Sequence, residues 1–128
     1  MIRGFINDNL EIVVQLAVHG PNGQELRIQA IVDTGFDGAL TLPTATIRQL
    51  GLPWLRSDCL ILADGSSHFF DVYGATVIWD RRSRRISIHE SETPPLVGTD
   101  LLEGHELNAE FVPGGIVTIR SLRRRRRP

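Results

Sequence analysis

One acidic side chain stands where an apolar segment runs into a turn, in Ile31-Val32-Asp33-Thr34-Gly35. An ionised carboxylate in an apolar setting is costly unless it is paired or used. Thr34 adds a hydroxyl for a local hydrogen bond, and Gly35 permits close backbone approach. Such a turn could present the Asp33 carboxylate rigidly in a cleft. Composition alone produces Asp-Thr-Gly in a chain of this size with a chance of roughly a few per cent, mostly as surface turns.

The elements that lead into this turn are strands with one buried face, because apolar and polar residues alternate. One face of residues 11–19 carries Ile12, Val14, Leu16 and Val18, and one face of residues 26–32 carries Leu26, Ile28, Ala30 and Val32. The polar loop between these segments contains Gly, Pro and Asn, so it predicts a hairpin. Similar turn signals recur along the chain, which predicts an all-β domain.

The remaining segments predict two short helices and three more hairpins. A helix over residues 43–50 places Pro43 at its first position and ends at Gly51. A second helix follows the strand at residues 96–98, with Asp100 as its N-cap and Gly104 as its stop. The hairpins span residues 60–73, with a two-residue Asp64-Gly65 turn, residues 74–89 and residues 107–120. Thr93-Pro94-Pro95 reads as a rigid connector.

In this order the elements resemble the retropepsin-like aspartic proteases. Ile31-Val32 precede Asp-Thr-Gly, a short helix and a flap hairpin (LILADGSSHFF) follow, and Leu96-Val97-Gly98 leads into the last helix. The resemblance covers roughly residues 11–111, and three ordered features are more specific than one tripeptide. It implies an acid-protease half-barrel with one lobe per chain, formed by residues 1–120. Thr99 stands where retroviral members have arginine, so the chain is more similar to the small bacterial members.

The resemblance also implies a mechanism. One Asp33 per chain cannot form the catalytic pair, so a homodimer must bring two copies together. Two carboxylates about 3 Å apart share one proton, so one acts as general base on a water molecule while the other hydrogen-bonds the scissile carbonyl. The implied activity is hydrolysis of an extended polypeptide by an aspartic endopeptidase, without a metal or another cofactor.

The family's motif assigns further roles to positions of this chain. Thr34 and Gly35 would lock the two active-site turns together across the dimer axis. Leu96, Val97 and Gly98 would support the turn from behind. The implied substrate-binding residues are Asp37 and, at the flap tip, Ala63, Asp64 and Gly65.

The composition and charge of the chain limit its domain number, its partners and its cellular compartment. The chain has 128 residues, 41% of them hydrophobic, and a net charge of −1, which fits one globular domain with no bulk attraction for nucleic acid or membranes. A single cysteine, Cys59, favours a reducing compartment. Asp8 and Glu11 interrupt any N-terminal signal peptide, and no apolar run reaches the ~18 residues that cross a bilayer. We therefore expect a cytoplasmic protein.

Residues 121–128 contain the run Arg123–Arg127, which we interpret as a disordered tail with at most weak binding to acidic partners. The four histidines are scattered and read as surface or ordinary polar positions, and the two tryptophans as core or edge residues.

Two other functions remain open on the sequence. A dimeric peptide-binding or assembly module could use the same fold without catalysis, because a fold does not dictate activity. An intact Asp-Thr-Gly favours the enzyme, since a pure binder has no reason to bring two acids together. A partner of nucleic acid acting through the arginine run is the third reading.

Overall fold

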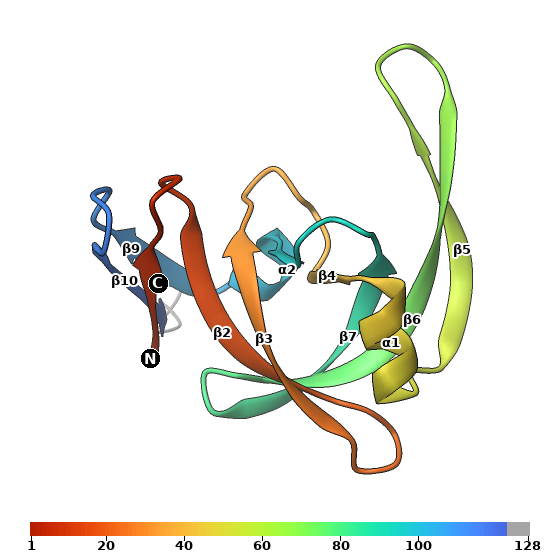
Figure 1. Cartoon of the computed structure of the whole chain (residues 1–128), viewed down its shortest axis with the longest axis horizontal. Helices are drawn as coiled ribbons and strands as arrows, with labels where there is room; N and C mark the ends of the chain where they lie inside the picture. Colours follow the sequence, from red (N-terminus) through yellow and green to blue (C-terminus); the bar gives the residue numbers. More distant parts are fainter. Residues whose placement is uncertain (123–128) are drawn as a thin grey trace, which may run out of the picture.

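A ten-stranded sheet, in the order β5-β6-β7-β4-β8-β3-β2-β1-β10-β9, organises the chain (Figure 1). The computed structural model describes residues 1–122. An additional pairing between β6 and β2 curls the sheet back on itself. The elements are β1 (Ile2–Ile6), β2 (Ile12–His19), β3 (Glu25–Val32), β4 (Leu40–Leu42), α1 (Thr44–Leu50), β5 (Trp54–Ile61), β6 (Ser67–Trp79), β7 (Arg82–Glu90), β8 (Leu96–Val97), α2 (Thr99–Leu102), β9 (His105–Ala109) and β10 (Ile116–Ser121).

The hairpin predicted from alternation is confirmed as β2 and β3, which pair antiparallel from Val13↔Ile31 to His19↔Glu25. Their inward residues join one hydrophobic core, because alternate side chains share a face of the sheet. Val14, Leu16 and Val18 of β2 and Ala30 and Val32 of β3 are all buried in this core. Trp79 is 1% exposed, as predicted for a core tryptophan, and Trp54 lies exposed on β5 at the sheet's edge.

The order of strands around β8 positions the Asp33 turn. β8 lies between β3, to which it pairs in parallel through Val32↔Val97, and β4, to which it pairs antiparallel through Leu40↔Val97. The chain therefore leaves β3, turns at residues 33–39 and returns on the other side of β8. A loop wrapped around a central strand has both of its ends fixed by that strand.

Helix α1 is confirmed, with one difference at its start. Pro43 lies at the N-cap in an extended conformation (φ −73°, ψ 158°), so it precedes the helix. Gly51 ends the helix in the left-handed region (φ 62°) and donates its N–H to the carbonyls of Arg48 and Ile47. Glycine suits this position because it has no Cβ. Ile47 and Leu50 face the core.

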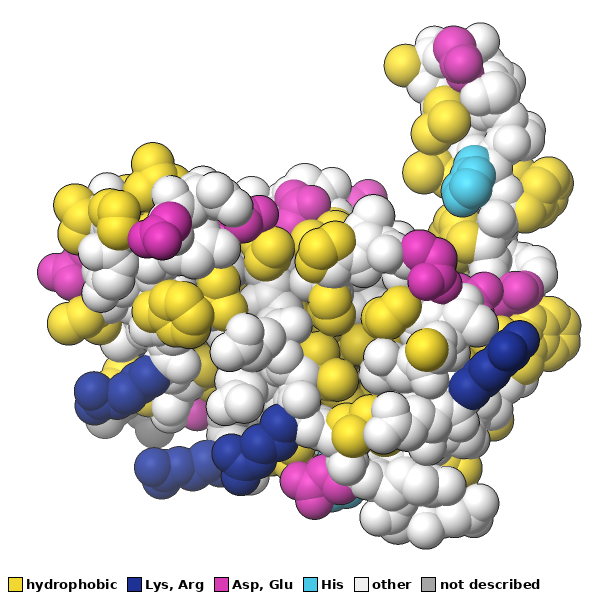
Figure 2. Space-filling model, viewed as in Figure 1, with side chains coloured by type: hydrophobic (Ala, Val, Ile, Leu, Met, Phe, Trp, Pro, Cys, Tyr) yellow, Lys and Arg dark blue, Asp and Glu magenta, His cyan; other side chains and the backbone are white. Residues whose placement is uncertain are grey.

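Two details of the expected structure were wrong: the two-residue turn of the β5–β6 hairpin and the N-cap of α2. The β5–β6 hairpin closes through three residues, Ala63, Asp64 and Gly65: the N–H of Leu62 donates to Ser66 O (2.8 Å) and the N–H of Gly65 to Leu62 O (2.9 Å). Gly65 has a φ of 84°, which is typical of a three-residue hairpin loop with a bulge and not of a two-residue turn. Figure 2 shows this hairpin projecting from the body of the molecule.

The second error concerns α2. Gly98, not Asp100, is its N-cap, and no side chain caps it. Asp100 lies in the first turn, where a negative charge still suits the helix dipole.

The chain ends hold strand pairings that the sequence pattern did not reveal. β1 was not predicted, and it pairs with both β10 and β2. The predicted last hairpin is confirmed as β9 and β10. β10 runs through Ser121, one residue beyond the predicted domain end, and the N–H of Leu122 donates to Gly104 O (2.9 Å). The predicted arginine tail, Arg123–Arg127, lies outside the described residues. No helix within residues 1–122 is long and apolar enough to cross a bilayer.

Because the loop of residues 33–39 passes closely around the end of β8, we expect position 98 to tolerate no side chain larger than that of glycine. A Cβ there would lie 2.1 Å from Gly38 O and 2.5 Å from Phe36 O, both backbone atoms. Gly98→Ala should lower the free energy of unfolding by about 3 kcal/mol, because the turn must shift to make room. Urea unfolding measures this change. Gly74→Ala is the matched control, since its Cβ would meet only Leu55 side-chain atoms at 3.6 Å or more; equal losses in both variants would contradict the packing argument.

Candidate active site at the Asp33 turn

Asp33 is held by backbone contacts on both sides. Its N–H donates to Val97 O of β8 (2.9 Å) and its carbonyl accepts the N–H of Phe36 (3.1 Å). Its carboxylate Oδ1 accepts the N–H of Gly35 (2.9 Å), which fixes the side chain within the turn. Asp33 is partly buried, whereas Thr34 and Gly35 are exposed. The turn therefore presents a positioned carboxylate at the surface of the chain.

The segment from β8 into α2 supports the far side of the turn. The N–H of Gly98 donates to Ala39 O (3.0 Å), that of Thr99 to Phe36 O (2.9 Å) and that of Asp100 to Gly38 O (3.2 Å). The Thr99 hydroxyl also reaches Phe36 O (3.4 Å). Three successive amides of one segment thus bind three carbonyls of the loop from Asp33 to Ala39, which restrains that loop.

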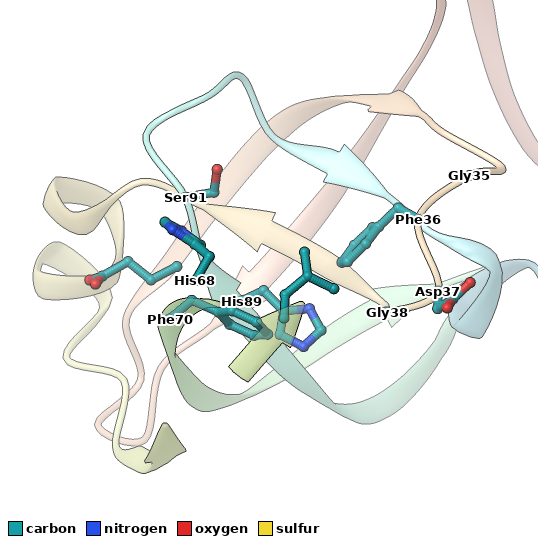
Figure 3. A pocket seen from close by; sticks show the side chains of 10 residues that line it. Gly35, Phe36, Asp37, Gly38, His68, Phe70, His89 and Ser91 are labelled. Carbon is teal, nitrogen blue, oxygen red and sulfur yellow. The ribbon is translucent and has the colours of Figure 1, made fainter. Parts of the chain in front are cut away.

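A cavity of about 370 Å³ opens beside this turn (Figure 3). Phe36, Asp37 and Gly38 of the turn form one side, Leu60 and Phe70 of the β5–β6 hairpin another, and His89 of β7 its inner end. Figure 3 shows Phe36, Phe70 and His89 grouped together. The wall is mainly apolar, so the cavity suits an apolar side chain. Asp37 is exposed at its margin.

His89 links the turn to the hairpin, a role that its interpretation as an ordinary polar position missed. Its ring meets Phe36 edge-on at 5.3 Å between centroids and Phe70 at 5.0 Å. Its Nδ1 is buried without a hydrogen-bond partner among the described residues. Burial lowers the pKa of His89; Asp58 opposes this shift and Arg56 adds to it. The imidazole is therefore favoured in its neutral form.

The β5–β6 hairpin carries the three predicted flap residues, Ala63, Asp64 and Gly65, at its tip, away from the body of the molecule (Figure 1). Asp64 accepts hydrogen bonds from the hydroxyl and the N–H of Ser66. These bonds, the hydroxyl first, lower the pKa of Asp64. No described hydrogen bond joins the tip to the Asp33 turn within one chain, so the tip stands apart from the turn.

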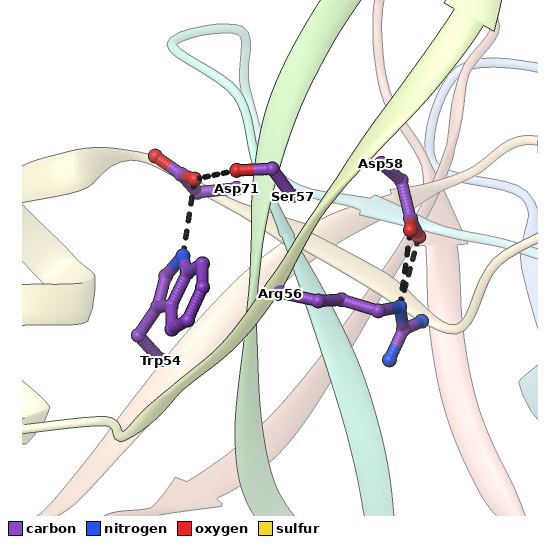
Figure 4. Close-up of polar contacts among 5 residues, drawn as sticks. All are labelled: Trp54, Arg56, Ser57, Asp58 and Asp71. Atoms are coloured by element: carbon purple, nitrogen blue, oxygen red, sulfur yellow. Dashed lines mark hydrogen bonds and ion pairs between the residues drawn. The ribbon is translucent and has the colours of Figure 1, made fainter.

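Cross-strand contacts brace the base of this hairpin (Figure 4). Asp71 Oδ1 accepts the hydroxyl of Ser57 (2.6 Å) and the Trp54 Nε1–H (3.1 Å). These bonds, Ser57 first, lower the pKa of Asp71. On the same strand as Ser57, Arg56 pairs with Asp58 at 3.1 Å. These side-chain contacts add to the strand pairing of the hairpin, which runs from Trp54↔Tyr73 to Ile61↔Ser67.

The structure brings Asp33, Thr34, Gly35 and Asp37 together with their supporting residues Leu96, Val97 and Gly98, and it keeps the flap tip apart. Within residues 1–122, no three His, Cys, Asp or Glu side chains cluster in a way that could hold a metal ion. The only Asp-Thr-Gly carboxylate of the chain is Asp33.

His89 predicts a pH-dependent stability. Its pKa in the folded chain lies below the ordinary value of 6.5, so the unfolded chain binds a proton there at a higher pH than the folded chain does. The free energy of unfolding should therefore decrease as pH falls through about 6.5. His89→Phe should reduce this decrease in chemical unfolding measured between pH 7.5 and about 5. His68→Phe, the same change at an exposed position of the hairpin, is the control; an unchanged pH dependence in His89→Phe would refute the assignment.

Comparison with known proteins identifies the architecture. A comparison of the sequence with protein-family models finds no match, and neither does a comparison with curated proteins. The chain is similar to a retropepsin-like aspartic protease from Rickettsia conorii, with a TM-score of 0.58 and 16% identity over 94% of this chain and 90% of that chain. It is also similar to EIAV protease complexed with the inhibitor HBY-793, with a TM-score of 0.48 and 19% identity over 71% of this chain and 84% of that chain. The similarity to the Rickettsia structure confirms the predicted all-β half-barrel: the chain has the retropepsin-like fold.

Proposed function

We propose that the chain is an aspartic endopeptidase that works as a homodimer. The observation that carries this proposal is the Asp33 turn: a carboxylate fixed by Gly35 and by Val97, next to exposed residues, in a retropepsin-like fold. A carboxylate that is positioned by its own backbone and left accessible is suited to proton transfer. Because the chain supplies one such group, a second copy provides the other.

The reaction requires the two Asp33 carboxylates to share one proton. Like charges at about 3 Å cannot both ionise, so the pair titrates as a unit. The ionised member takes a proton from a water molecule, whose oxygen attacks the carbonyl carbon of the peptide. The protonated member donates a hydrogen bond to the carbonyl oxygen. When the C–N bond breaks, the amine leaves with a proton from the pair, and the products are a carboxylic acid and an amine.

The surroundings of the turn provide the binding functions. Thr34 is exposed at the turn and would meet its counterpart across the dimer axis. The β5–β6 hairpin would close over the substrate, which pairs with the cleft edges as an added strand. Ala63, Asp64, Gly65 and Asp37 would contact the substrate backbone. The apolar cavity below the hairpin would take a large apolar side chain of the substrate.

Asp33→Asn tests the catalytic assignment. The amide cannot act as general base, so cleavage of a peptide library should fall by roughly 10³-fold or more, while the circular dichroism spectrum and the sedimentation coefficient stay the same. Glu106→Gln is the matched carboxyl-to-amide control, because Glu106 lies exposed on β9 in a surface ion pair with Arg120. Undiminished cleavage by Asp33→Asn would remove Asp33 from the mechanism. A dimer that binds peptides with or without Asp33 and never cleaves them would instead be a binding module.

Two adjacent phenylalanines test the role of the cavity. Phe70 lines it, whereas Phe69 next to it is 70% exposed, on the other face of β6. Phe70→Ala should change the preferred residue at a single substrate position and lower kcat/KM for the original peptide roughly tenfold or more. Phe69→Ala should leave the preference unchanged. Cleavage-site sequencing of the library digest measures both, and a preference unaltered by Phe70→Ala would show that the cavity does not read the substrate.

A further inference from the structure

A hollow lined by three arginine side chains lies at the edge of the molecule away from the Asp33 turn. It has a volume of about 290 Å³, and Arg3 of β1, Arg27 of β3 and Arg81 of the β6–β7 turn line it. We refer to it as the basic hollow. All three arginines are exposed. Figure 1 places the N-terminus and the β6–β7 turn at the edge opposite to the loop of residues 33–39, and Figure 2 shows dark-blue arginine side chains gathered on that side of the molecule.

Strand pairing forms the floor of the basic hollow. Ala17 of β2 pairs with Arg27 on one side and with Ile78 of β6 on the other, and cross-strand partners point to the same face of a sheet. This face is opposite the core, because Leu16 and Val18, the neighbours of Ala17, are buried in the core. The short side chain of Ala17 leaves the floor open beside the stem of Arg27.

The charge of the basic hollow is positive. Within residues 1–122, none of its three arginines pairs with a carboxylate. The acidic residue in the lining is Asp80, and both of its oxygens are already bonded: Oδ1 pairs with the N-terminal ammonium group and Oδ2 accepts the hydroxyl of Ser121 (2.9 Å). Three guanidinium groups therefore face one engaged carboxylate, and the hollow attracts anions.

Arg81 occupies a backbone position that suits glycine better. Asp80 and Arg81 form the two-residue β6–β7 turn between the paired residues Trp79 and Arg82, and their φ angles are 49° and 67°. Positive φ at both positions is typical of a type I′ turn, whose second residue is most often glycine. An arginine there strains the backbone, and strained residues cluster at binding sites. Here the strain occurs at the residue that brings a third guanidinium group to the hollow.

We propose that the basic hollow binds the phosphate backbone of a nucleic acid without reading its sequence. Guanidinium groups form paired hydrogen bonds with phosphate oxygens, and all 14 basic residues of the chain are arginines. Ser121, which contacts Asp80 of the hollow, is followed closely in the sequence by the run Arg123–Arg127. The net charge of −1 gives the whole chain no attraction for nucleic acid, so binding depends on this local group. The inference does not depend on peptidase activity.

The lining favours nucleic acid over other anionic partners. Among the described residues that line the hollow, none is aromatic, and Met1 is the only exposed large hydrophobic residue. Protein–protein interfaces are enriched in aromatic residues, and a membrane-surface site places a row of apolar side chains beside its basic ones. Without aromatic rings there is also no platform on which bases stack. The contacts are therefore to phosphates, which carry no sequence information.

Fluorescence anisotropy of fluorescein-labelled oligo(dT) tests the hollow in the full chain. The double variant Arg3→Gln/Arg27→Gln should raise the dissociation constant about tenfold or more at low salt, because two phosphate contacts are lost. The dependence of log K on log salt should become shallower by about 0.7 for each arginine removed. Arg48→Gln/Arg56→Gln, which removes the same charge at exposed positions of α1 and β5, is the matched control and should bind like the wild type.

Arg81→Gly separates a binding role from a structural one. Glycine suits a φ of 67°, so the urea midpoint of this variant should equal or exceed that of the wild type. Its dissociation constant for oligo(dT) should nevertheless rise about threefold or more. A variant that folds well and binds oligo(dT) as tightly as the wild type would overturn the inference.

Other outcomes identify a different ligand and would equally overturn the inference. Unchanged binding by Arg3→Gln/Arg27→Gln would assign the interaction to the run Arg123–Arg127 alone. Displacement of oligo(dT) by inorganic phosphate at the same phosphate concentration and constant ionic strength would show a site for the free ion. Polyglutamate or phosphatidylserine vesicles that bind through Arg3 and Arg27 more tightly than oligo(dT) does would show an acidic protein or a membrane as the partner.

Discussion

The backbone bond from Asp33 N–H to Val97 O is the contact on which the rest of the site depends. It fixes the start of a loop whose other end is fixed by Gly98 N–H on Ala39 O, so one short strand sets the position of the whole turn. Gly98 is where the two segments come too close for any side chain. The carboxylate can then be oriented while it stays only partly buried, because its position is set by backbone contacts and not by burial.

Two parts of the chain form opposite sides of the cavity, the loop of residues 33–39 and the projecting β5–β6 hairpin. The turn is bound to β8 and α2 at both ends, whereas the β5–β6 hairpin is held by its own strand pairing as far as Ile61↔Ser67 and by Asp71 with Ser57 and Trp54 at its base. The cavity between them has His89 at its inner end, packed against one aromatic ring from each part. A side chain that fills this cavity would contact both parts at once.

Local patterns predicted the elements that are local. Alternation gave β2 and β3, and Gly51 marked the end of α1. β1 was missed because Gly4 and Arg3 interrupt its short apolar pattern; Gly4 is required there, since its Cβ would lie 2.2 Å from Val13 O. The cavity could not be predicted from the sequence, because its residues come from the turn, β5, β6 and β7 and meet only through the strand order. The Asp33 turn itself was recognisable from its residues, but a single chain cannot show whether a second copy completes a pair of carboxylates.

Mixed dimers test most directly whether two chains build one catalyst. Wild-type and Asp33→Asn chains are equilibrated in equal amounts at constant total concentration, and the initial rate of peptide cleavage is compared with that of the wild type alone. If each site needs an Asp33 from both chains, only wild-type dimers are active, and random pairing leaves about one quarter of the rate. A rate of about one half would mean that each chain works on its own, which would contradict the shared pair of carboxylates.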